Sequence, residues 1–406
     1  MKILFVHQNC PGQFKHLAPA LAKLGHQVVF IGRPGRPDLP GVTRIEYKTH
    51  RQPNSKTHHY LIGTESAVLS GQAVARICFE LQKKGFVPDV MIGNPGWGET
   101  LFLKDVWPDR PLISLSEFYY SGRGSDVGFD PEFPAGHDAI LRTRIRNSQH
   151  LLAIEAADFA YSPMNWQKAQ FPLAYQRKIR VIHDGIDTTA IGPNPDAQFQ
   201  LPNGKVLSRS DEILTYVSRN LEPYRGFHSF MRALPKILEA RPNAHVLIAG
   251  GDDVSYGSKP KDHDTWRDAM FAEIGTLPDR VTFLSRIPYD AYLRVLQISS
   301  AHLYLTYPFV LSWSMLEAMA SGCCVIGSRT PPVEEVIEHG KNGYLVDFFD
   351  TDEISQSVSQ VLAKRDQVGD MRAAARDTIV AKYDLTPCLA AQMALIEEAR
   401  AAFGPV

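Results

Sequence analysis

The sequence contains no run of 18 apolar residues, so we expect none of its helices to cross a membrane. Its opening, MKILFVHQNC, becomes polar too soon for a signal peptide and predicts a first β-strand instead. Cysteines are few and odd in number, and no C-x-x-C pair occurs, which argues against a disulfide framework. The five are Cys10, Cys78, Cys323, Cys324 and Cys388. We therefore expect reduced thiols and a cytoplasmic protein.

An excess of charge of one sign is also missing. The formal net charge of the 406 residues is −1, which is not the signature of a nucleic-acid-binding protein. The two halves differ, however: residues 1–185 carry 22 Lys and Arg against 16 Asp and Glu, a net of +6, and the rest carries 21 against 28, a net of −7. This asymmetry fits an anionic partner or membrane headgroups near the first half, or simply two solvated domains with uneven charge.

The glycine pattern of a dinucleotide site is absent from the first β–loop–α–β unit. Its loop, NCPGQF, holds only Gly12, so G-x-G-x-x-G is not formed. Gly12 either lets the backbone approach a ligand or only makes a tight turn. Metal-ligand spacing is missing as well, because His50, His58 and His59 have no acidic or thiol partner at a suitable distance in the sequence. We expect no metal and no cofactor.

Strands and helices alternate along both halves of the chain, which is typical of parallel α/β sheets. A chain of 406 residues is long for one core, so we expect two domains of roughly 200 residues each. The fold class predicted is α/β, with two tandem doubly wound, Rossmann-like domains at residues 1–185 and 205–380. The segment 186–204 is rich in Pro, Asn and Gly and is expected to be a linker.

Residues 301–347 predict a strand, a loop, a short helix and a second strand. The loop before the helix contains Phe309, Val310, Leu311 and Ser312. A helix that begins at the carboxyl edge of a parallel sheet offers free N–H groups to an anion. Glu317 lies one turn inside this helix. A phosphate contact beside a hydroxyl contact is what a nucleotide sugar requires, but Ser314-x-x-Glu317 also matches a capping box, in which the carboxylate serves the helix alone.

Other charged side chains follow strand ends, where α/β proteins bind their ligands. Arg219 and Arg225 lie across one predicted strand–helix loop and could bind phosphate oxygens in forked hydrogen bonds, with Gly226 easing close approach. Both could equally be surface arginines. Glu117 follows the strand RPLISL and is either a site residue or only a helix cap or surface group.

Several segments together resemble the family-four (group 1) retaining glycosyltransferases of the GT-B fold. The segments are VIHDGIDT, YVSRNLEPYRG, IAGGDD, FVLSWSMLEAMASG and PVEEVIEHGKNGYLVD. They cover about 181–347, and the first half matches in architecture only. The resemblance implies an acceptor domain and a donor domain that face each other across a cleft, with a C-terminal helix (385–406) crossing back onto the N-terminal domain.

The resemblance also assigns roles to individual positions. Arg219 matches a phosphate-binding Arg, Arg225 stands where Lys is usual, and Glu317 matches the Glu that binds the ribose hydroxyls. The remaining positions of the nucleotide-sugar site implied in this way are Gly12, Gly251, Arg286, Ile287, Phe309, Val310, Leu311 and Ser312, with Ser285 beside the base. Arg219, Arg225 and Glu117 are the catalytic candidates.

Two positions depart from the family pattern. Phe309 stands where the first Glu of E-x7-E, which touches the donor sugar, is expected, and Glu117 replaces a histidine of the N-terminal domain. Sugar recognition must therefore differ, or some activity is lost.

The implied reaction is transfer of a sugar from a UDP- or GDP-sugar to an acceptor hydroxyl with retention of anomeric configuration. The acceptor could be a lipid-linked sugar, a polysaccharide, a small molecule or a protein, as in bacterial polysaccharide or glycoconjugate biosynthesis. A peripheral contact between the N-terminal domain and the inner membrane surface is compatible with the charge asymmetry. One alternative is a sugar-nucleotide epimerase of the same fold. The other is a non-catalytic GT-B module that binds a nucleotide sugar or a partner, and Phe309 keeps this alternative open.

Overall fold

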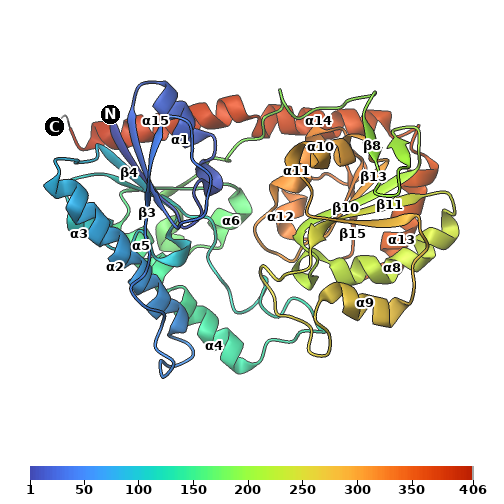
Figure 1. Ribbon diagram of the computed structural model, residues 1–406, viewed down its shortest axis with the longest axis horizontal. Coiled ribbons are helices and arrows are strands. Elements are labelled where there is room, and N and C mark those ends of the chain that lie inside the picture. Colours follow the sequence, from blue (N-terminus) through green and yellow to red (C-terminus); the bar gives the residue numbers. More distant parts are fainter. Residues whose placement is uncertain (405–406) are drawn as a thin grey trace. The chain divides into compact units, whose positions relative to one another are not determined.

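The computed structural model describes residues 1–404 and divides the chain into two compact units. Unit 1 comprises Met1–Gly185 together with Leu385–Val406, and unit 2 comprises Ile186–Asp384. Each unit contains one parallel sheet with helices on both faces (Figure 1). The predicted doubly wound α/β architecture is thus found in both halves.

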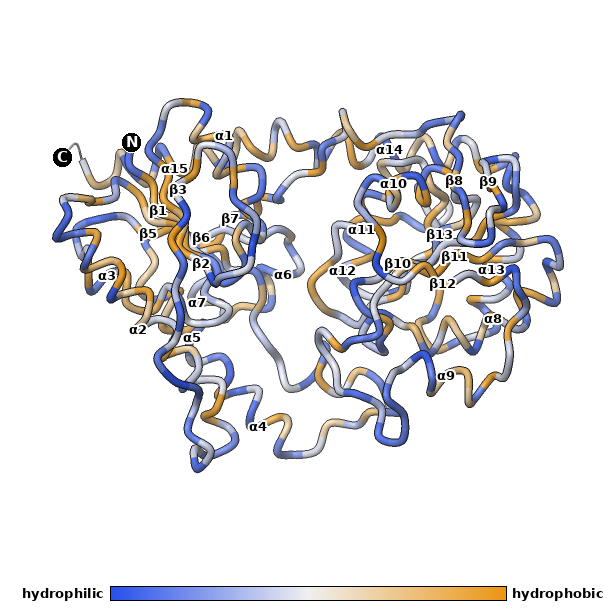
Figure 2. The backbone as a smooth tube through the Cα atoms, viewed as in Figure 1, coloured by the Kyte–Doolittle hydropathy of each residue, from blue (hydrophilic) through white to orange (hydrophobic). Residues whose placement is uncertain are grey.

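The sheet of unit 1 has seven parallel strands in the order β3-β2-β1-β4-β5-β6-β7. Their bounds are β1 (Lys2–Val6), β2 (Gln27–Gly32), β3 (Val42–Glu46), β4 (Val90–Gly93), β5 (Leu112–Leu115), β6 (Phe159–Ser162) and β7 (Ile179–Val181). In β1, Ile3 lies beside Val28 of β2 and Val90 of β4. Figure 2 shows these central strands as hydrophobic segments, as expected of strands that are buried on both faces.

Side chains alternate between the two faces of β1. Ile3 and Phe5 pack with α1 and α15, whereas Leu4 and Val6 pack with α2 and α3. The C-terminal helix α15 is therefore part of the core of unit 1. The helices of this unit are α1 (Leu17–Lys23), α2 (Ile62–Lys83), α3 (Leu103–Val106), α4 (His137–Arg146), α5 (Ser148–Ala156), α6 (Asn165–Ala169), α7 (Leu173–Gln176) and α15 (Leu385–Ala402), with 3-10 turns η1 (Gly12–Phe14) and η2 (Pro95–Trp97).

The sheet of unit 2 has six parallel strands in the order β12-β11-β10-β13-β14-β15. Their bounds are β10 (Ile213–Asn220), β11 (His245–Gly251), β12 (Val281–Ser285), β13 (Ala301–Tyr304), β14 (Val325–Ser328) and β15 (Tyr344–Val346). A small antiparallel pair, β8 (Gln198–Gln200) and β9 (Val206–Ser208), precedes them.

Helices α8 and α13 of unit 2 pack against each other, and α13 lies on β10, β13 and β15. The helices are α8 (Phe227–Ala240), α9 (Trp266–Ile274), α10 (Tyr289–Gln297), α11 (Trp313–Ala320), α12 (Pro331–Glu334), α13 (Thr351–Ala363) and α14 (Gly369–Tyr383), with a 3-10 turn η3 (Pro223–Arg225).

The predicted linker at 186–204 is wrong, because this segment belongs to unit 2. Ala197 and Leu201 are buried with Leu207, Ile213 and Leu247 in one hydrophobic cluster. A Pro- and Asn-rich composition marks turns, and it does not show whether the apolar residues between them are covered. All five cysteines are buried, and none of them forms a disulfide within residues 1–404. No helix in the same range combines the length and apolarity needed to cross a membrane.

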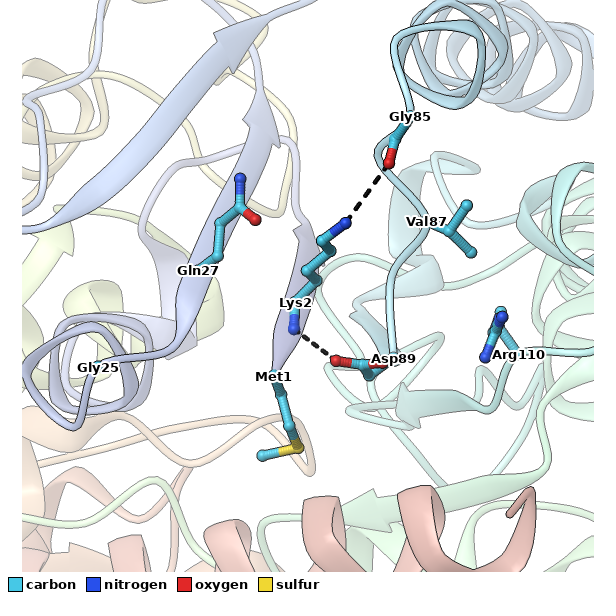
Figure 3. A pocket seen from close by; sticks show the side chains of 8 residues that line it. All are labelled: Met1, Lys2, Gly25, Gln27, Gly85, Val87, Asp89 and Arg110. Atoms are coloured by element: carbon cyan, nitrogen blue, oxygen red, sulfur yellow. Dashed lines mark hydrogen bonds between the residues drawn. The ribbon is translucent and has the colours of Figure 1, made fainter. Parts of the chain in front are cut away.

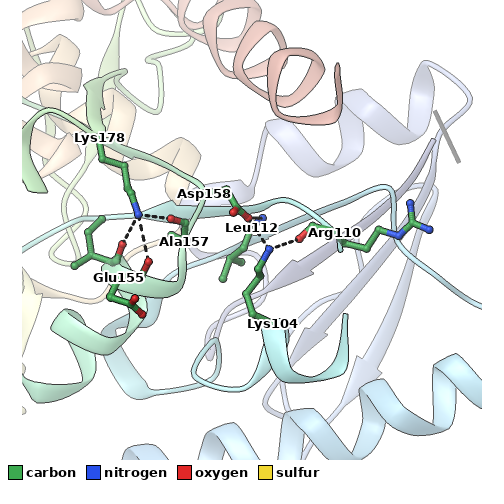
Figure 4. A network of polar contacts seen from close by, with 8 residues as sticks. Lys104, Arg110, Leu112, Glu155, Ala157, Asp158 and Lys178 are labelled. Carbon is green, nitrogen blue, oxygen red and sulfur yellow. Dashed lines mark hydrogen bonds and ion pairs between the residues drawn. The ribbon is translucent and has the colours of Figure 1, made fainter. Parts of the chain in front are cut away.

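At the amino-terminal ends of the unit 1 strands, charged side chains stabilise the fold. A hollow lined by Lys2, Gln27, Asp89 and Arg110 opens there (Figure 3). Near it, Lys178 donates to three backbone carbonyls at the carboxyl end of α5, and Lys104 pairs with Asp158 and donates to a carbonyl (Figure 4). Lysines at a helix carboxyl end satisfy its free carbonyls.

Candidate functional site

Each sheet reverses its strand order at one point, and ligands of doubly wound folds bind beyond the carboxyl ends of the strands at that point. In unit 2 the reversal falls between β10 and β13, and in unit 1 it falls between β1 and β4. The predicted site residues of unit 2 lie at or after the carboxyl ends of β10, β11, β12 and β13, and those of unit 1 follow β1 and β5. Both groups therefore lie at carboxyl edges.

Arg225 spans the reversal point of unit 2 and is buried. Its Nη1 donates to the hydroxyl oxygens of Thr306 at 2.7 Å and Tyr304 at 3.2 Å, and its Nη2 donates to the carbonyl of Val310 at 3.2 Å. The guanidinium also lies 5.3 Å from the ring centre of Tyr256. Arg225 is therefore not a surface arginine, and its guanidinium is buried in the protein. Its hydrogen bonds hold the loop that follows β13 in place.

Arg219, the other predicted phosphate ligand, is exposed near the end of β10. Within residues 1–404, its guanidinium forms no hydrogen bond or ion pair. The two arginines therefore differ in role: Arg225 is committed to the protein, and Arg219 has donors to offer to a ligand.

Helix α11 begins after Ser312, which is its N-cap and accepts a hydrogen bond from the backbone N–H of Ser314. The capping box between Ser314 and Glu317 is therefore not formed. The two carboxylate oxygens of Glu317 instead accept hydrogen bonds from the hydroxyls of Tyr289 and Tyr292, each at 2.7 Å. Burial is the main cause that raises the pKa of both phenols, and the charge of Glu317 is the second.

Glu317 is itself buried, with 5% of its surface exposed, whereas Tyr289 is 53% exposed. A carboxylate offers about four acceptor positions. Two are used by the phenols, so further hydroxyl donors can still be accommodated, and the exposed phenol is the one that can move aside.

The segment after β12 meets the end of β11. Arg286 donates to Asn220 at 2.9 Å and pairs with Asp253 at 2.8 Å. It also lies across Gly251, where an added Cβ would be 2.6 Å from the arginine Nε. Ser285 has φ of +53°, unusual for a residue other than glycine, and such strained conformations cluster at ligand sites. Ile287 is half-buried beside the hydrophobic cluster around Leu247.

Phe309, which stands in place of the expected carboxylate, is buried among aromatic rings. Its centroid lies 5.0 Å from that of Tyr256 and 5.7 Å from that of Tyr224, and the latter contact is edge-to-face. Leu311 is also buried, and Val310 is half-buried. The loop before α11 is therefore apolar where a carboxylate was expected.

The predicted residues of unit 1 are joined by a hydrogen-bonded network. The amide oxygen of Gln13 lies 2.8 Å from Nε2 of His7, and the amide nitrogen of Gln13 donates to Glu117 at 2.6 Å. Asn94, which follows β4, donates to the other carboxylate oxygen of Glu117 at 3.0 Å. Glu117 is therefore a member of a network at the reversal point, not a helix cap.

Gly12 is required by this network. It has φ of +51°, and a Cβ at this position would lie 2.6 Å from the ring of His7. His7 is buried, and burial lowers its pKa to about 4, so the ring is neutral at pH 7. Its Nδ1 accepts from the N–H of Asn9, which places the ring proton on Nε2, where it is donated to Gln13.

Sequence reasoning missed His7, Gln13 and Asn94 in unit 1, and Tyr289 and Tyr292 in unit 2. A signal existed for two of them, because His7 and Asn94 are polar residues at the ends of apolar strands, directly after β1 and β4 at the reversal point. The spacing of the tyrosines puts them on one helix face but does not show what that face meets.

Two family models match the chain. The first, described as the glycosyl transferase family 4 group, matches residues 24–191, and the second, described as glycosyl transferases group 1, matches residues 201–378. The chain is 25% identical over 290 residues to a GDP-mannose-dependent alpha-(1-6)-phosphatidylinositol monomannoside mannosyltransferase of Mycobacterium tuberculosis, which covers 68% of each protein. It is 24% identical over 207 residues to the N-acetyl-alpha-D-glucosaminyl L-malate synthase of Bacillus anthracis, which covers 51% of this chain and 50% of that one.

Solved structures share the fold over almost the whole length. Sucrose-phosphate synthase from Thermosynechococcus elongatus matches with a TM-score of 0.76 and 18% identity, covering 99% of this chain and 100% of that one. Anabaena HepE in complex with UDP matches with a TM-score of 0.69 and 15% identity, covering 98% and 100%. At this identity the likeness establishes the fold. The two family matches lie in successive halves of the sequence, and together with the fold they indicate a glycosyltransferase of GT-B architecture that transfers a sugar from a nucleotide sugar.

Proposed function

We propose that this glycosyltransferase binds a UDP- or GDP-sugar at the carboxyl edge of unit 2 and transfers the sugar to an acceptor hydroxyl with retention of configuration. The observation that carries the proposal is the placement of Glu317. Its carboxylate is not used by its own helix, and it keeps acceptor positions for the two hydroxyls of a ribose.

The exposed guanidinium of Arg219 supplies the positive charge that a diphosphate requires. Charge develops on the leaving diphosphate as the bond to the sugar breaks, and a fixed cation lowers the free energy of that state. Arg225 positions the loop beside it through Thr306 and Val310. In this proposal Arg219 stabilises the leaving group, so no metal is needed.

The relatives support either donor base. The mycobacterial relative is named for GDP-mannose, whereas solved relatives of the fold contain UDP and UDP-glucose. In unit 2, Ser285, Arg286 and Ile287 are proposed to meet the base, because the strained backbone and the arginine both lie at that edge.

We propose that Phe309 changes how the sugar is held. An aromatic ring in a cluster with Tyr224 and Tyr256 cannot accept hydrogen bonds from sugar hydroxyls as a carboxylate does. Apolar contact with the sugar ring would replace them. In unit 1, Glu117 remains the proposed catalytic carboxylate, held in place by Gln13 and Asn94.

A peripheral membrane contact of unit 1 is supported by its surface. Leu61, Ile62 and Leu141 are 45%, 45% and 52% exposed on α4 and at the start of α2, two helices that contact each other. Arg142 and Arg144 are exposed on the same helix as Leu141. Apolar side chains beside arginines suit an anionic lipid surface. Leu61→Ser with Leu141→Ser should lower binding to phosphatidylglycerol vesicles, and Leu173→Ser, on α7, should not.

The proposed reaction is tested by incubating the protein with UDP- and GDP-sugars without acceptor and following the products by mass spectrometry. Slow release of free sugar with the nucleoside diphosphate is expected, because water replaces the acceptor. A free epimer would show an epimerase instead, and an unchanged donor across the panel would show a non-catalytic module. The anomeric configuration of the first transfer product, read by NMR, decides retention.

A further inference from the structure

Unit 1 carries a group of arginines at its carboxyl edge that the donor site does not use. Arg33 and Arg36 lie on the loop that follows β2, and both are exposed. Within residues 1–404, each guanidinium makes one hydrogen bond: Nε of Arg33 donates to the hydroxyl of Tyr47 at 3.2 Å, and Nη2 of Arg36 donates to the side-chain oxygen of Asn9 at 2.7 Å. The remaining guanidinium nitrogens form no hydrogen bond in that part of the chain.

The loop that bears these two arginines is held in shape by a third. Arg44, on β3, donates to the backbone carbonyls of both Arg33 and Arg36, the former at 3.1 Å. Gly35 between them has φ of +79°, which allows the tight turn. A loop fixed in this way loses little conformational freedom when a ligand binds.

Nearby carboxyl groups do not neutralise this pair. Asp38 and Glu46 form their ion pairs with Arg44, at 3.6 and 2.7 Å. Within residues 1–404, no carboxylate forms an ion pair with Arg33 or Arg36.

Glu99 is the other carboxyl group beside this loop. It is fully buried against Tyr47, and burial raises its pKa, which the hydrogen bond from Tyr47 opposes only in part. Glu99 accepts its hydrogen bond from Tyr47 and, within residues 1–404, forms no ion pair with Arg33.

The pair is connected to the network that contains Glu117. Asn9, which accepts from Arg36, donates its backbone N–H to Nδ1 of His7 at 2.8 Å, and His7 leads through Gln13 to Glu117. Arg36 and the proposed catalytic carboxylate therefore lie on one hydrogen-bonded path along the carboxyl edge of a single sheet.

We infer that Arg33 and Arg36 bind a phosphate group of the acceptor, so that the acceptor of this enzyme is an anion. The forked guanidinium matches the geometry of a phosphate. The inference rests on the proposed function, because it names the class of acceptor for that reaction. The anion can belong to a soluble phosphate ester or to a lipid headgroup.

The test is calorimetric titration of inorganic phosphate and of glycerol 3-phosphate into the full chain, with saturating UDP or GDP present to occupy the donor site. We expect glycerol 3-phosphate to bind and glycerol not to bind. Arg33→Ala with Arg36→Ala should weaken phosphate binding at least tenfold. Arg110→Ala, which removes one charge from the opposite edge of the same sheet (Figure 3), should leave it unchanged.

Two further measurements separate the outcomes. Tyr47→Phe breaks the anchor of Arg33 but keeps both guanidiniums, so it should retain most of the phosphate affinity, which a general disturbance of the fold would not. Vesicles of phosphatidylinositol in phosphatidylcholine, compared with phosphatidylcholine alone, show whether a lipid headgroup competes with phosphate. If wild type binds UDP or GDP but no phosphate, or the double variant binds phosphate as wild type does, the inference is wrong and the donor site stands. Failure to bind any nucleotide would instead overturn the proposed function.

Discussion

Glu317 shows how a single side chain acquires its role from a neighbouring helix. Its oxygens are satisfied by two phenols of α10, one buried and one half-exposed. Removing the buried donor leaves a buried acceptor unpaired, which costs about 1–3 kcal/mol. Water can replace the exposed donor.

We therefore expect Tyr292→Phe to lower the free energy of unfolding by about 1–3 kcal/mol and Tyr289→Phe to lower it by less than about 0.5 kcal/mol. Urea unfolding followed by circular dichroism measures both. The two variants remove the same atom from partners of the same carboxylate, so equal losses would show that burial does not decide the effect.

Gly12 allows a parallel test in unit 1. Gly12→Ala places a methyl group against the ring of His7 and strains a backbone with positive φ. Gly25→Ala meets the same backbone strain, at φ of +86°, with open space around it. We expect Gly25→Ala to cost about 1 kcal/mol and Gly12→Ala a further 1–3 kcal/mol or so from overpacking. Thermal unfolding distinguishes them, and identical melting temperatures would contradict the packing described for His7.

At the scale of elements, the loop after β11 depends on one buried carboxylate. Glu222 accepts hydrogen bonds from three successive backbone N–H groups, those of Ser255, Tyr256 and Gly257, at 3.0–3.1 Å. This loop carries Asp253, the partner of Arg286 at the proposed base site. The carboxylate therefore holds a part of the donor site in place.

Glu222→Gln should speed hydrogen exchange of these three amides by about tenfold or more, because a charged acceptor is replaced by a weaker neutral one. Glu239→Gln, on the exposed side of α8, is the matched control and should leave their exchange unchanged. Unaltered exchange in Glu222→Gln would mean that the loop is ordered by other contacts.

The order of the elements could be predicted from the sequence, because long apolar strands and amphipathic helices alternate throughout. The predictions were weaker where tertiary contacts decide. Ser314 and Glu317 match a capping box, yet Ser312 caps the helix, and the phenols of α10 donate hydrogen bonds to the carboxylate of Glu317. A local motif shows which hydrogen bonds could form, and the packing of the folded chain decides which of them do.

The same limit applies to the arginines and to the segment 186–204. Nothing in the sequence separates the buried Arg225 from the exposed Arg219, because the difference arises from the loop after β13 folding over the former. Likewise, Ala197 and Leu201 occur among turn residues, and only the folded unit shows that they are covered. The placement of Gly12 and Glu117 in one network depends on His7 and Gln13, which link two strand ends.

For the whole molecule, buried neutral histidines set the response to acid. Burial lowers the pKa of His7, His150 and His183 in unit 1 to about 4, and that of His302 in unit 2 to about 3. An unfolded histidine titrates near 6.5 and therefore binds its proton first as the pH falls. The native state is then disfavoured, by up to about 3 kcal/mol for each histidine of unit 1 and up to about 5 kcal/mol for His302.

The stability that these groups contribute should be complete above pH 6.5 and should be lost as the pH falls from 6.5 towards 4. Unfolding free energies from urea titrations at pH 7.5, 6 and 5 measure this loss. Unit 1, with three of the four histidines, should weaken more steeply than unit 2, which hydrogen exchange can follow separately. A flat profile over this range would contradict the burial of the imidazoles.

The central claim, that the carboxyl edge of unit 2 binds the nucleoside diphosphate of a sugar donor, is tested most directly by calorimetric titration of UDP and GDP. We predict that one of them binds wild type and Arg110→Ala equally, and that Arg219→Ala and Glu317→Gln each weaken its binding about tenfold or more, since each removes a charge-assisted contact. Equal affinity in all four proteins, or no binding of either nucleotide to wild type, would contradict the account.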